Sequence, residues 1–326
     1  MIKDAFERVH DYLRISLTDN CNFRCFYCMP DEHYDFTPPS GLMQAEEIFQ
    51  LASIFVANGV KKIRLTGGEP LVRKDAGDII SMLGQLPVEL VITTNGTRIE
   101  ELLPVLIQAG IKTINVSLDT LNEEKFLFIT RRNVFHKVKN NIELLLASNI
   151  RVKINMVVMK GLNEGEINDF VNWTKDHAIE VKFIEFMPFS GNRWTSNKLF
   201  SLEEILQTIE RKYTIVHITP KANDTAKLYQ IPGHRGTFSI ISTMTVPFCS
   251  TCNRMRLTAD GKFKNCLFSA GETDLLTPFR AGEDILPLIK NTIWNKKKEM
   301  GGQLTTDTEK LDVGTIQNRS MISIGG

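Results

Sequence analysis

Six cysteines, in two groups of three, are the residues of this chain best suited to metal chemistry. The first group has the spacing C-x3-C-x2-C and the second C-x2-C-x13-C. A structural zinc site and a ferredoxin-type cluster each normally use four protein ligands, whereas each of these groups has three thiols. The spacing therefore predicts two [4Fe–4S] clusters with one iron left open in each, held by Cys21, Cys25 and Cys28 and by Cys249, Cys252 and Cys266.

The six cysteines could also form disulfides or, in the second group, a zinc site. Six thiols could form three disulfides, but a chain of 326 residues can build a core without them, and thiols used only for packing would be scattered. The second group could instead be a zinc knuckle with a distant fourth ligand. No histidine lies within residues 249–266, and His234 is a candidate upstream.

The composition excludes several classes of partner. Lys and Arg total 39 against 38 for Asp and Glu, so the net charge of +1 predicts no nucleic-acid binding, and any anion must be bound by a local cluster of cations. No run of 18 apolar residues occurs, and the first residues lack the apolar core of a signal peptide. We therefore expect no membrane association and a cytoplasmic location.

Six strand–helix repeats must position the first cysteine group. The strands are expected at residues 12–17, 61–66, 88–94, 112–118, 151–159 and 180–187. This alternation predicts a parallel sheet with right-handed crossovers, either as an open doubly wound sheet or as an incomplete barrel.

The faces of the strands decide between these two architectures. Polar and apolar residues alternate, which places each set on its own face of the sheet. Buried cations on one face in several strands would be costly unless that face lined a wet or ligand-filled cavity. We therefore predict an α/β fold, an incomplete (β/α)6 TIM-like barrel with a polar lumen lined by Arg14, Ser16, Arg64, Thr66, Lys153 and Asn155.

The chain changes character after residue 195, which predicts two domains. Residues 1–195 would form the partial barrel with the first cluster. Residues 196–326 would form an α+β extension that closes its open side and carries the second cluster and a Gly-Gly tail. In this extension we expect a helix at 202–211, paired strands at 226–231 and 237–241, a hairpin turn at Asp260-Gly261 and a helix at 284–295. Residues 4–8 are expected to form a helical turn.

The first cysteine group and the turn Gly67-Gly68-Glu69-Pro70 together resemble the radical S-adenosylmethionine (SAM) enzymes. The turn follows an expected strand, at the rim where barrel enzymes carry their active sites. By this resemblance, SAM would chelate the open iron of the first cluster through its amino and carboxylate groups. Electron transfer would then cleave its sulfonium and give a deoxyadenosyl radical.

Two further features indicate one family among the radical SAM enzymes. The second cysteine group contains Arg254-x-Arg256, and the chain ends in Gly325-Gly326. With Leu13-Arg14-Ile15 and the run 115–119, N-V-S-L-D, this combination resembles the GTP 3′,8-cyclase family of molybdenum cofactor biosynthesis over essentially the whole chain. That resemblance implies abstraction of the ribose C3′ hydrogen of GTP. Attack of the C3′ radical on guanine C8 and reduction would give (8S)-3′,8-cyclo-7,8-dihydroguanosine 5′-triphosphate.

The resemblance also assigns roles to single residues. The guanine base would bind the open iron of the second cluster, and the tail would insert toward the active site rather than fray. Lys182 stands where the family is expected to have Arg and is left out of the site, because lysine lacks the bidentate fork. Arg254 and Arg256 are the candidates for catalysis, with Arg256 aiding reduction or protonation of the aminyl intermediate. The SAM contacts would be Tyr27, Gly68, Ser117 and Met187, the GTP contacts Arg14, Arg64, Thr93, Lys153, Arg254, Met255 and Arg256, and the tail Gly325 and Gly326.

The same resemblance implies partners and leaves two rival functions. The partners would be a flavodoxin- or ferredoxin-type electron donor, a downstream cyclic pyranopterin monophosphate synthase and a second copy of the chain. One rival is a radical SAM maturase that modifies peptides, although such enzymes usually carry more C-terminal cysteines. The other is a non-catalytic iron–sulfur or zinc regulator, which would gain nothing from an open coordination position.

Overall fold

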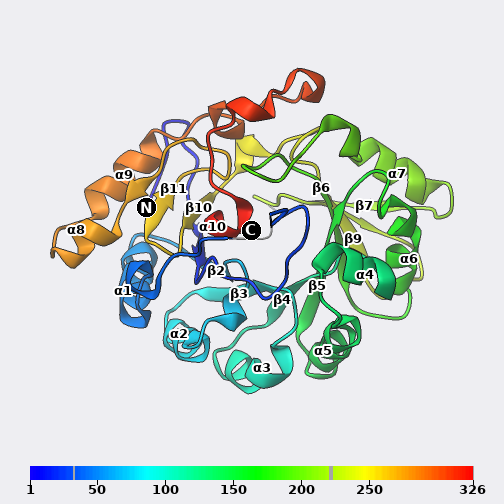
Figure 1. Cartoon of the computed structure of the whole chain (residues 1–326), viewed down its shortest axis with the longest axis horizontal. Coiled ribbons are helices and arrows are strands. Elements are labelled where there is room, and N and C mark those ends of the chain that lie inside the picture. The colour runs from blue at the N-terminus through cyan, green and yellow to red at the C-terminus, as the bar shows by residue number, and fades with distance from the viewer. Residues whose placement is uncertain (32–33, 220–222, 326) are drawn as a thin grey trace.

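One curved β-sheet with helices on its outer face forms the frame of the molecule (Figure 1). The computed structural model describes residues 1–31, 34–219 and 223–325. Six parallel strands pair in chain order, as the sequence predicted, and they form the incomplete (β/α)6 barrel. They are β1 (Tyr12–Ser16), β2 (Lys62–Thr66), β3 (Glu89–Thr94), β4 (Thr113–Ser117), β5 (Arg151–Val158) and β6 (Glu180–Glu185).

The C-terminal extension continues this sheet at both edges. Strand β9 (Thr237–Ile241) pairs in parallel with β6, and β10 (Arg254–Leu257) pairs in parallel with β1. The remaining strands add to these two in antiparallel pairs. The hairpins were predicted, but their attachment to β6 and β1 was not, because the pairing partner of a short strand lies far away in sequence. The outer strands are β7 (Val216–Ile218), β8 (Lys227–Gln230), β11 (Lys262–Lys264) and β12 (Thr273–Asp274).

The helices bury apolar stripes against the outer face of the sheet. Helix α1 (Ala45–Ala57) buries Ile48, Leu51 and Phe55 at helical spacing. In the described part of the chain, no helix is both long and apolar enough to cross a bilayer. The other helices are α2 (Ala76–Leu83), α3 (Ile99–Gln108), α4 (Glu123–Thr130), α5 (Phe135–Ala147), α6 (Ile167–Trp173), α7 (Leu202–Glu210), α8 (Leu276–Arg280), α9 (Leu286–Trp294) and α10 (Met321–Ile324).

The predicted alternation of the strands is confirmed. Leu13, Ile15, Ile63 and Leu65 are fully buried in the apolar core, whereas Arg14 points to the opposite, inner face. Because strands from both parts of the chain share one sheet, a two-domain division at residue 195 stays a prediction.

The expected helical turn at residues 4–8 is wrong. A bridge between Lys3 and Val9 closes this segment as a hairpin. The Asp4 carboxylate accepts hydrogen bonds from the backbone N–H groups of Phe6 and Arg8, at 2.9 and 3.1 Å, and so favours a turn over a helix.

Candidate active site

Both cysteine groups line one cavity of about 350 Å³ at the inner face of the sheet. The groups are separated by more than 200 residues of sequence, and the parallel pairing of β10 with β1 brings them together. Most of the residues predicted for the site line this cavity. They are the six cysteines, Tyr27, Gly68, Ser117, Met187, Arg14, Arg64, Thr93, Arg254 and Arg256.

The loop after β1 holds the first cysteine group in a fixed backbone conformation. The backbone N–H of Cys28 donates to the Cys25 carbonyl at 2.9 Å, which makes a tight turn. The loop is also bound to the end of α4, since Arg24 N–H donates to the Thr130 carbonyl at 3.0 Å and Phe26 N–H to the Ile129 carbonyl at 3.1 Å. The three thiols are therefore presented to the cavity by backbone contacts.

The first-group thiols need a cation to ionise. Burial raises the pKa of Cys21 to about 12, with a smaller contribution from Glu69, and burial also raises the pKa of Cys28 to about 12. Within the described residues, no three Cys, His, Asp or Glu side chains converge on a single metal ion. The three donors are all thiols that line one cavity, and thiolates are the usual ligands of iron–sulfur clusters, so this donor set fits such a cluster.

The turn of residues 67–70 lies against the cysteine loop. A Cβ added at Gly68 would meet the Asp19 and Asn20 carbonyl oxygens at 2.5 Å, so only glycine fits there. The buried Glu69 carboxylate accepts hydrogen bonds from the Asn95 backbone N–H at 2.5 Å and the Thr94 hydroxyl at 2.8 Å. Burial raises the pKa of Glu69 to about 7. These contacts fix the turn to the end of β3.

Tyr27 joins the cysteine loop to the segment that follows β4. Its hydroxyl donates to the Asp119 carboxylate at 2.7 Å, and that carboxylate also accepts from the Val157 backbone N–H at 2.9 Å. Burial raises the pKa of Asp119 to about 6. Tyr27 is thereby held beside Ser117 and Met187, which line the same cavity and were predicted with it as SAM contacts.

Three neighbouring parallel strands place guanidinium groups in a row. Arg14 on β1 lies in register with Arg64 on β2 and with Arg256 on β10. Arg64 donates to the Thr93 hydroxyl at 3.0 Å. Burial and the neighbouring arginines lower the pKa of Arg14, and burial followed by Arg254 lowers the pKa of Arg256 to about 10. Concentrated buried cations of this kind are stabilised by a polyanion such as a triphosphate.

Sequence reasoning missed Tyr12, which lies among these cations. Arg64 Nε lies 2.5 Å from the Tyr12 hydroxyl, and the guanidinium carbon of Arg254 lies 5.8 Å from the centre of the Tyr12 ring. Burial alone would raise the pKa of Tyr12, but Arg64, Arg14 and Arg254 hold it at about 7. The alternation that identified Arg14 could have found Tyr12, two residues earlier on the same face.

The structure does not bring Lys153 or the Met255 side chain to the cavity. The Lys153 ammonium pairs with Glu180 at 2.5 Å, and Met255 points into the apolar core because it alternates with Arg254 and Arg256 along β10. Lys182, which sequence reasoning left out, does line the cavity and pairs with Glu180 at 2.9 Å. Glu180 therefore holds both lysines.

The second cysteine group lies where β10 begins, with donors directed at its sulfurs. The backbone N–H of Met300 donates to Cys249 Sγ at 3.3 Å, and the Lys296 ammonium to Cys252 Sγ at 3.5 Å. His234 lies elsewhere, within 2.9 Å of the Thr174 hydroxyl, and does not line the cavity. The zinc alternative completed by His234 therefore fails.

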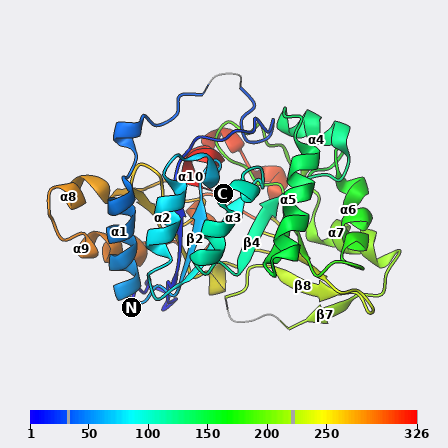
Figure 2. The same ribbon diagram turned by 90° about the horizontal axis from the view of Figure 1, so that it is seen from below.

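The C-terminal tail and α10 lie inside the curve of the sheet, near β2 (Figure 1, Figure 2), and the tail contacts Arg256 of the arginine row. Arg256 donates a short hydrogen bond to the Gly325 carbonyl, and a Cβ at Gly325 would meet Thr66 Oγ1 at 2.6 Å. Met321 and Ile322 line the cavity, whereas Gly326 lies outside the described residues. The tail is thus inserted rather than frayed.

Comparison with known proteins identifies the family. The model of the Radical SAM superfamily matches residues 15–174, and the model of Molybdenum Cofactor Synthesis C matches residues 179–301. The GTP 3′,8-cyclase of Peptoclostridium acidaminophilum is 40% identical over 331 residues, which cover 100% of this chain and 98% of that protein. This chain belongs to the GTP 3′,8-cyclase family. As a radical SAM protein of this family, it has SAM and iron–sulfur clusters as its cofactors.

Other relatives of this chain differ in length. The mitochondrial GTP 3′,8-cyclase of Arabidopsis thaliana is 44% identical, over 100% of this chain and 84% of that protein. Molybdenum cofactor biosynthesis protein 1 of Mus musculus is 45% identical over 99% of this chain but only 51% of its own length. The chain therefore spans about half the length of its animal relatives.

A solved structure supports the fold. The Streptococcus suis SuiB structure bound to S-adenosylmethionine matches 89% of this chain and 69% of SuiB, with a TM-score of 0.62 and 15% identity. At this identity the similarity concerns the fold alone, and it supports the incomplete barrel.

Proposed function

We propose that this chain cyclises GTP to (8S)-3′,8-cyclo-7,8-dihydroguanosine 5′-triphosphate, the first step of molybdenum cofactor biosynthesis. The observation that carries the proposal is the single cavity lined by both cysteine groups and by the arginine row. A nucleotide triphosphate placed there would lie between two clusters and against buried cations. The relatives named GTP 3′,8-cyclase support GTP as that nucleotide.

The residues at one end of the cavity would bind SAM and its cluster, and those at the other end would bind the substrate. Cys21, Cys25 and Cys28 would hold the first cluster, and Tyr27 and Gly68 would shape the SAM site beside it. When bound there, the cluster and SAM supply a carbon-centred radical that abstracts hydrogen. The tail would cover the cavity and exclude water from it.

The other end would bind the substrate. Cys249, Cys252 and Cys266 would hold the second cluster with one iron open to the guanine base. Arg14, Arg64 and Arg254 would bind the triphosphate oxygens through charge-assisted hydrogen bonds. The buried Nε of Arg254 has no hydrogen-bond acceptor among the described residues, as expected of a group that binds a ligand oxygen. Arg256 lies against the tail and beside this end, where it could hold a proton for the final reduction.

Two rivals fit the cavity less well. A peptide-modifying maturase would not account for the arginine row, and a non-catalytic regulator would not account for two open three-thiol sites. The relatives that match the whole chain include proteins named GTP 3′,8-cyclase.

The partners and location remain proposals. An electron donor of the flavodoxin or ferredoxin type would reduce the first cluster, a cyclic pyranopterin monophosphate synthase would use the product, and the chain would form a homodimer. We propose that it works in the cytoplasm, although one plant relative is named mitochondrial.

Product analysis tests the function. Reconstituted protein with SAM, dithionite and GTP should yield a triphosphate isomer of GTP that mass spectrometry and NMR identify as the 3′,8-cyclised nucleotide. Replacing either cysteine group by serine should abolish the product. Formation of the product by the variant with Cys249, Cys252 and Cys266 replaced would contradict the role of the second cluster.

A further inference from the structure

Lys296 is a buried cation beside the second cysteine group. It is the first of three consecutive lysines that follow α9, and only 4% of its surface is exposed, whereas Lys297 and Lys298 are exposed. Lysine is almost never fully buried unless it is paired with an anion. The burial of this one member of the run therefore requires a partner.

The contacts of the Lys296 ammonium identify that partner. Its Nζ lies 3.0 Å from the Arg254 carbonyl oxygen and 3.5 Å from Cys252 Sγ. In the described ranges 1–31, 34–219 and 223–325, no ion pair joins Lys296 to a carboxylate. Cys252 Sγ, which would be a thiolate when it binds iron, is thus the partner of this ammonium.

The backbone fixes Lys296 in this position. Its N–H donates to the Ile293 carbonyl at 2.9 Å and so closes the end of α9, where the helix dipole favours a cation. Asn265, next to the ligand Cys266, donates to the Thr292 carbonyl at 2.8 Å and ties the same helix end to the cysteine group. The ammonium is therefore held against the thiol by α9 rather than by chance rotation of a surface side chain.

The N-terminal hairpin adds a second restraint. Arg8 donates to the Cys249 carbonyl at 2.7 Å and to the Lys298 carbonyl at 2.9 Å, so it joins the cysteine turn to the segment that carries Lys296. The Arg8 guanidinium itself is paired with Asp4 at 2.6 Å. Arg8 therefore directs its charge at Asp4 and at backbone carbonyls, whereas Lys296 directs its charge at a sulfur.

We propose that Lys296 donates a hydrogen bond to the Cys252 thiolate of the second cluster and thereby raises the reduction potential of that cluster. The inference rests on the proposed function, because it requires a cluster at Cys249, Cys252 and Cys266. A hydrogen bond and a positive charge at a ligating sulfur stabilise the reduced cluster, which carries one more negative charge than the oxidised cluster. Lys296 is a positioning and tuning residue and takes no part in binding iron.

A redox titration of the second cluster alone tests this role. The full chain with Cys21, Cys25 and Cys28 replaced by alanine would be reconstituted anaerobically, so that EPR reports only the second cluster. In this background Lys296→Met removes the charge and the donor at similar volume, Lys296→Gln keeps a donor without charge, and Lys296→Arg keeps both. Lys298→Met is the matched control, because Lys298 undergoes the same substitution at an exposed position two residues away.

The proposal predicts an order of midpoint potentials. Lys296→Met should shift the potential to more negative values, Lys296→Gln should shift it less, and Lys296→Arg and Lys298→Met should remain near the unsubstituted background. If Lys296→Met does not assemble a cluster, the midpoint potential of Lys296→Gln is compared with that of the background and tests the proposal in its place. Equal potentials in the assembled Lys296 variants would overturn the proposal. Absence of iron in the background chain itself would instead overturn the proposed function.

Discussion

Arg254 and Arg256 face the cavity from the strand that follows the Cys252 ligand. Replacing either by alanine should weaken GTP binding by about 10- to 100-fold, because each charge-assisted hydrogen bond contributes about 1.5–3 kcal/mol. Equilibrium binding of GTP to the reconstituted protein measures this change, with iron content as the check that both clusters remain. Arg280→Ala is the control, since Arg280 pairs with Glu47 on the surface. Unchanged GTP affinity in both variants would contradict the assignment of Arg254 and Arg256 as GTP contacts.

The free energy of unfolding should depend on pH through the carboxyl group of Glu180. Burial alone would raise its pKa, but Lys182 and Lys153 lower it to about 2, well below the ordinary value of 4.5. The ionised carboxylate therefore stabilises the fold above pH of about 4.5, and this contribution is lost as the pH falls toward 2.

The variant Glu180→Gln measures that contribution. Chemical unfolding should show wild type more stable than Glu180→Gln above pH 5. The difference should shrink as the pH is lowered toward 3. Glu7→Gln, which alters an exposed pair with Lys3, should show no such trend. If the difference in unfolding free energy stays constant with pH, the two lysines do not lower the pKa of Glu180.

At the level of single residues, the sequence was informative where chemistry and spacing coincide. The cysteine groups and the arginines at alternate strand positions were recognisable without a structure, and both sets line one cavity. Tyr12 was missed because a tyrosine in a strand is usually core. Lys296 gave no signal, because three consecutive lysines are typical of a solvated surface. Lys153 could not be excluded, because its ion pair with Glu180 depends on two side chains from neighbouring strands.

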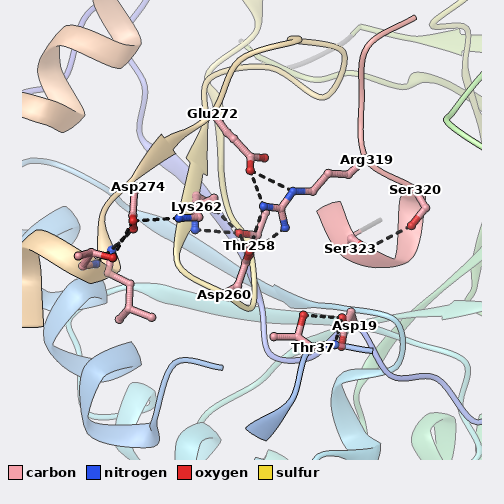
Figure 3. A network of polar contacts seen from close by, with 12 residues as sticks. Asp19, Thr37, Thr258, Asp260, Lys262, Glu272, Asp274, Arg319, Ser320 and Ser323 are labelled. Carbon is pink, nitrogen blue, oxygen red and sulfur yellow. Dashed lines mark hydrogen bonds and ion pairs between the residues drawn. The ribbon is translucent and has the colours of Figure 1, made fainter. Parts of the chain in front are cut away.

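Arg319 joins the tail to the β10–β11 hairpin (Figure 3). Arg319, which precedes α10, donates to both oxygens of Asp260 at 3.0 and 2.9 Å and also to Glu272. Asp260 lies in the turn of the hairpin whose first strand carries Arg256. The anchor therefore fixes the tail to the same element that supplies the arginine row.

Releasing this anchor should loosen the tail without disturbing the barrel. In Arg319→Ala, amide hydrogens of residues 321–325 should exchange at least about tenfold faster, because several charge-assisted hydrogen bonds are lost. Exchange in β2 and β3 should not change. Hydrogen-exchange mass spectrometry measures both regions, with Arg280→Ala as the control for loss of a surface arginine. Equal exchange of the tail in wild type and Arg319→Ala would show that other contacts hold it.

Among the elements, local patterns predicted the helices and strands but not all of their neighbours. The boundaries of α1, α2 and β1–β6 follow from apolar periodicity and turn residues. The parallel pairing of β9 and β10 with the barrel strands could not be predicted from the sequence, because pairing between strands so far apart in the chain depends on packing rather than on a local signal. The turn at residues 4–8 was missed because the Asp4 side chain replaces helical backbone bonds.

For the whole molecule, the cavity is lined by residues from most of the sequence, from Tyr12 to Ile322. Because each cluster binds the folded cavity and not the unfolded chain, loading should raise the thermal unfolding temperature. Anaerobic calorimetry of the apo and reconstituted forms tests this, and the reconstituted form should hold about eight irons per chain, four per cluster. Loss of one cysteine group should halve the iron and remove part of the stabilisation. Identical unfolding of the apo and loaded forms would contradict clusters bound within the cavity.

The central claim is that radical generation at the first cysteine group serves GTP bound at the second. Reconstituted protein should be incubated anaerobically with SAM and dithionite, together with GTP, ATP or no nucleotide, and 5′-deoxyadenosine should be quantified by chromatography. The cavity described here predicts that 5′-deoxyadenosine forms with GTP, that GTP is consumed alongside it, and that ATP and the blank give little. Equal and slow cleavage of SAM in all three would contradict the claim and would favour a radical SAM enzyme with another substrate.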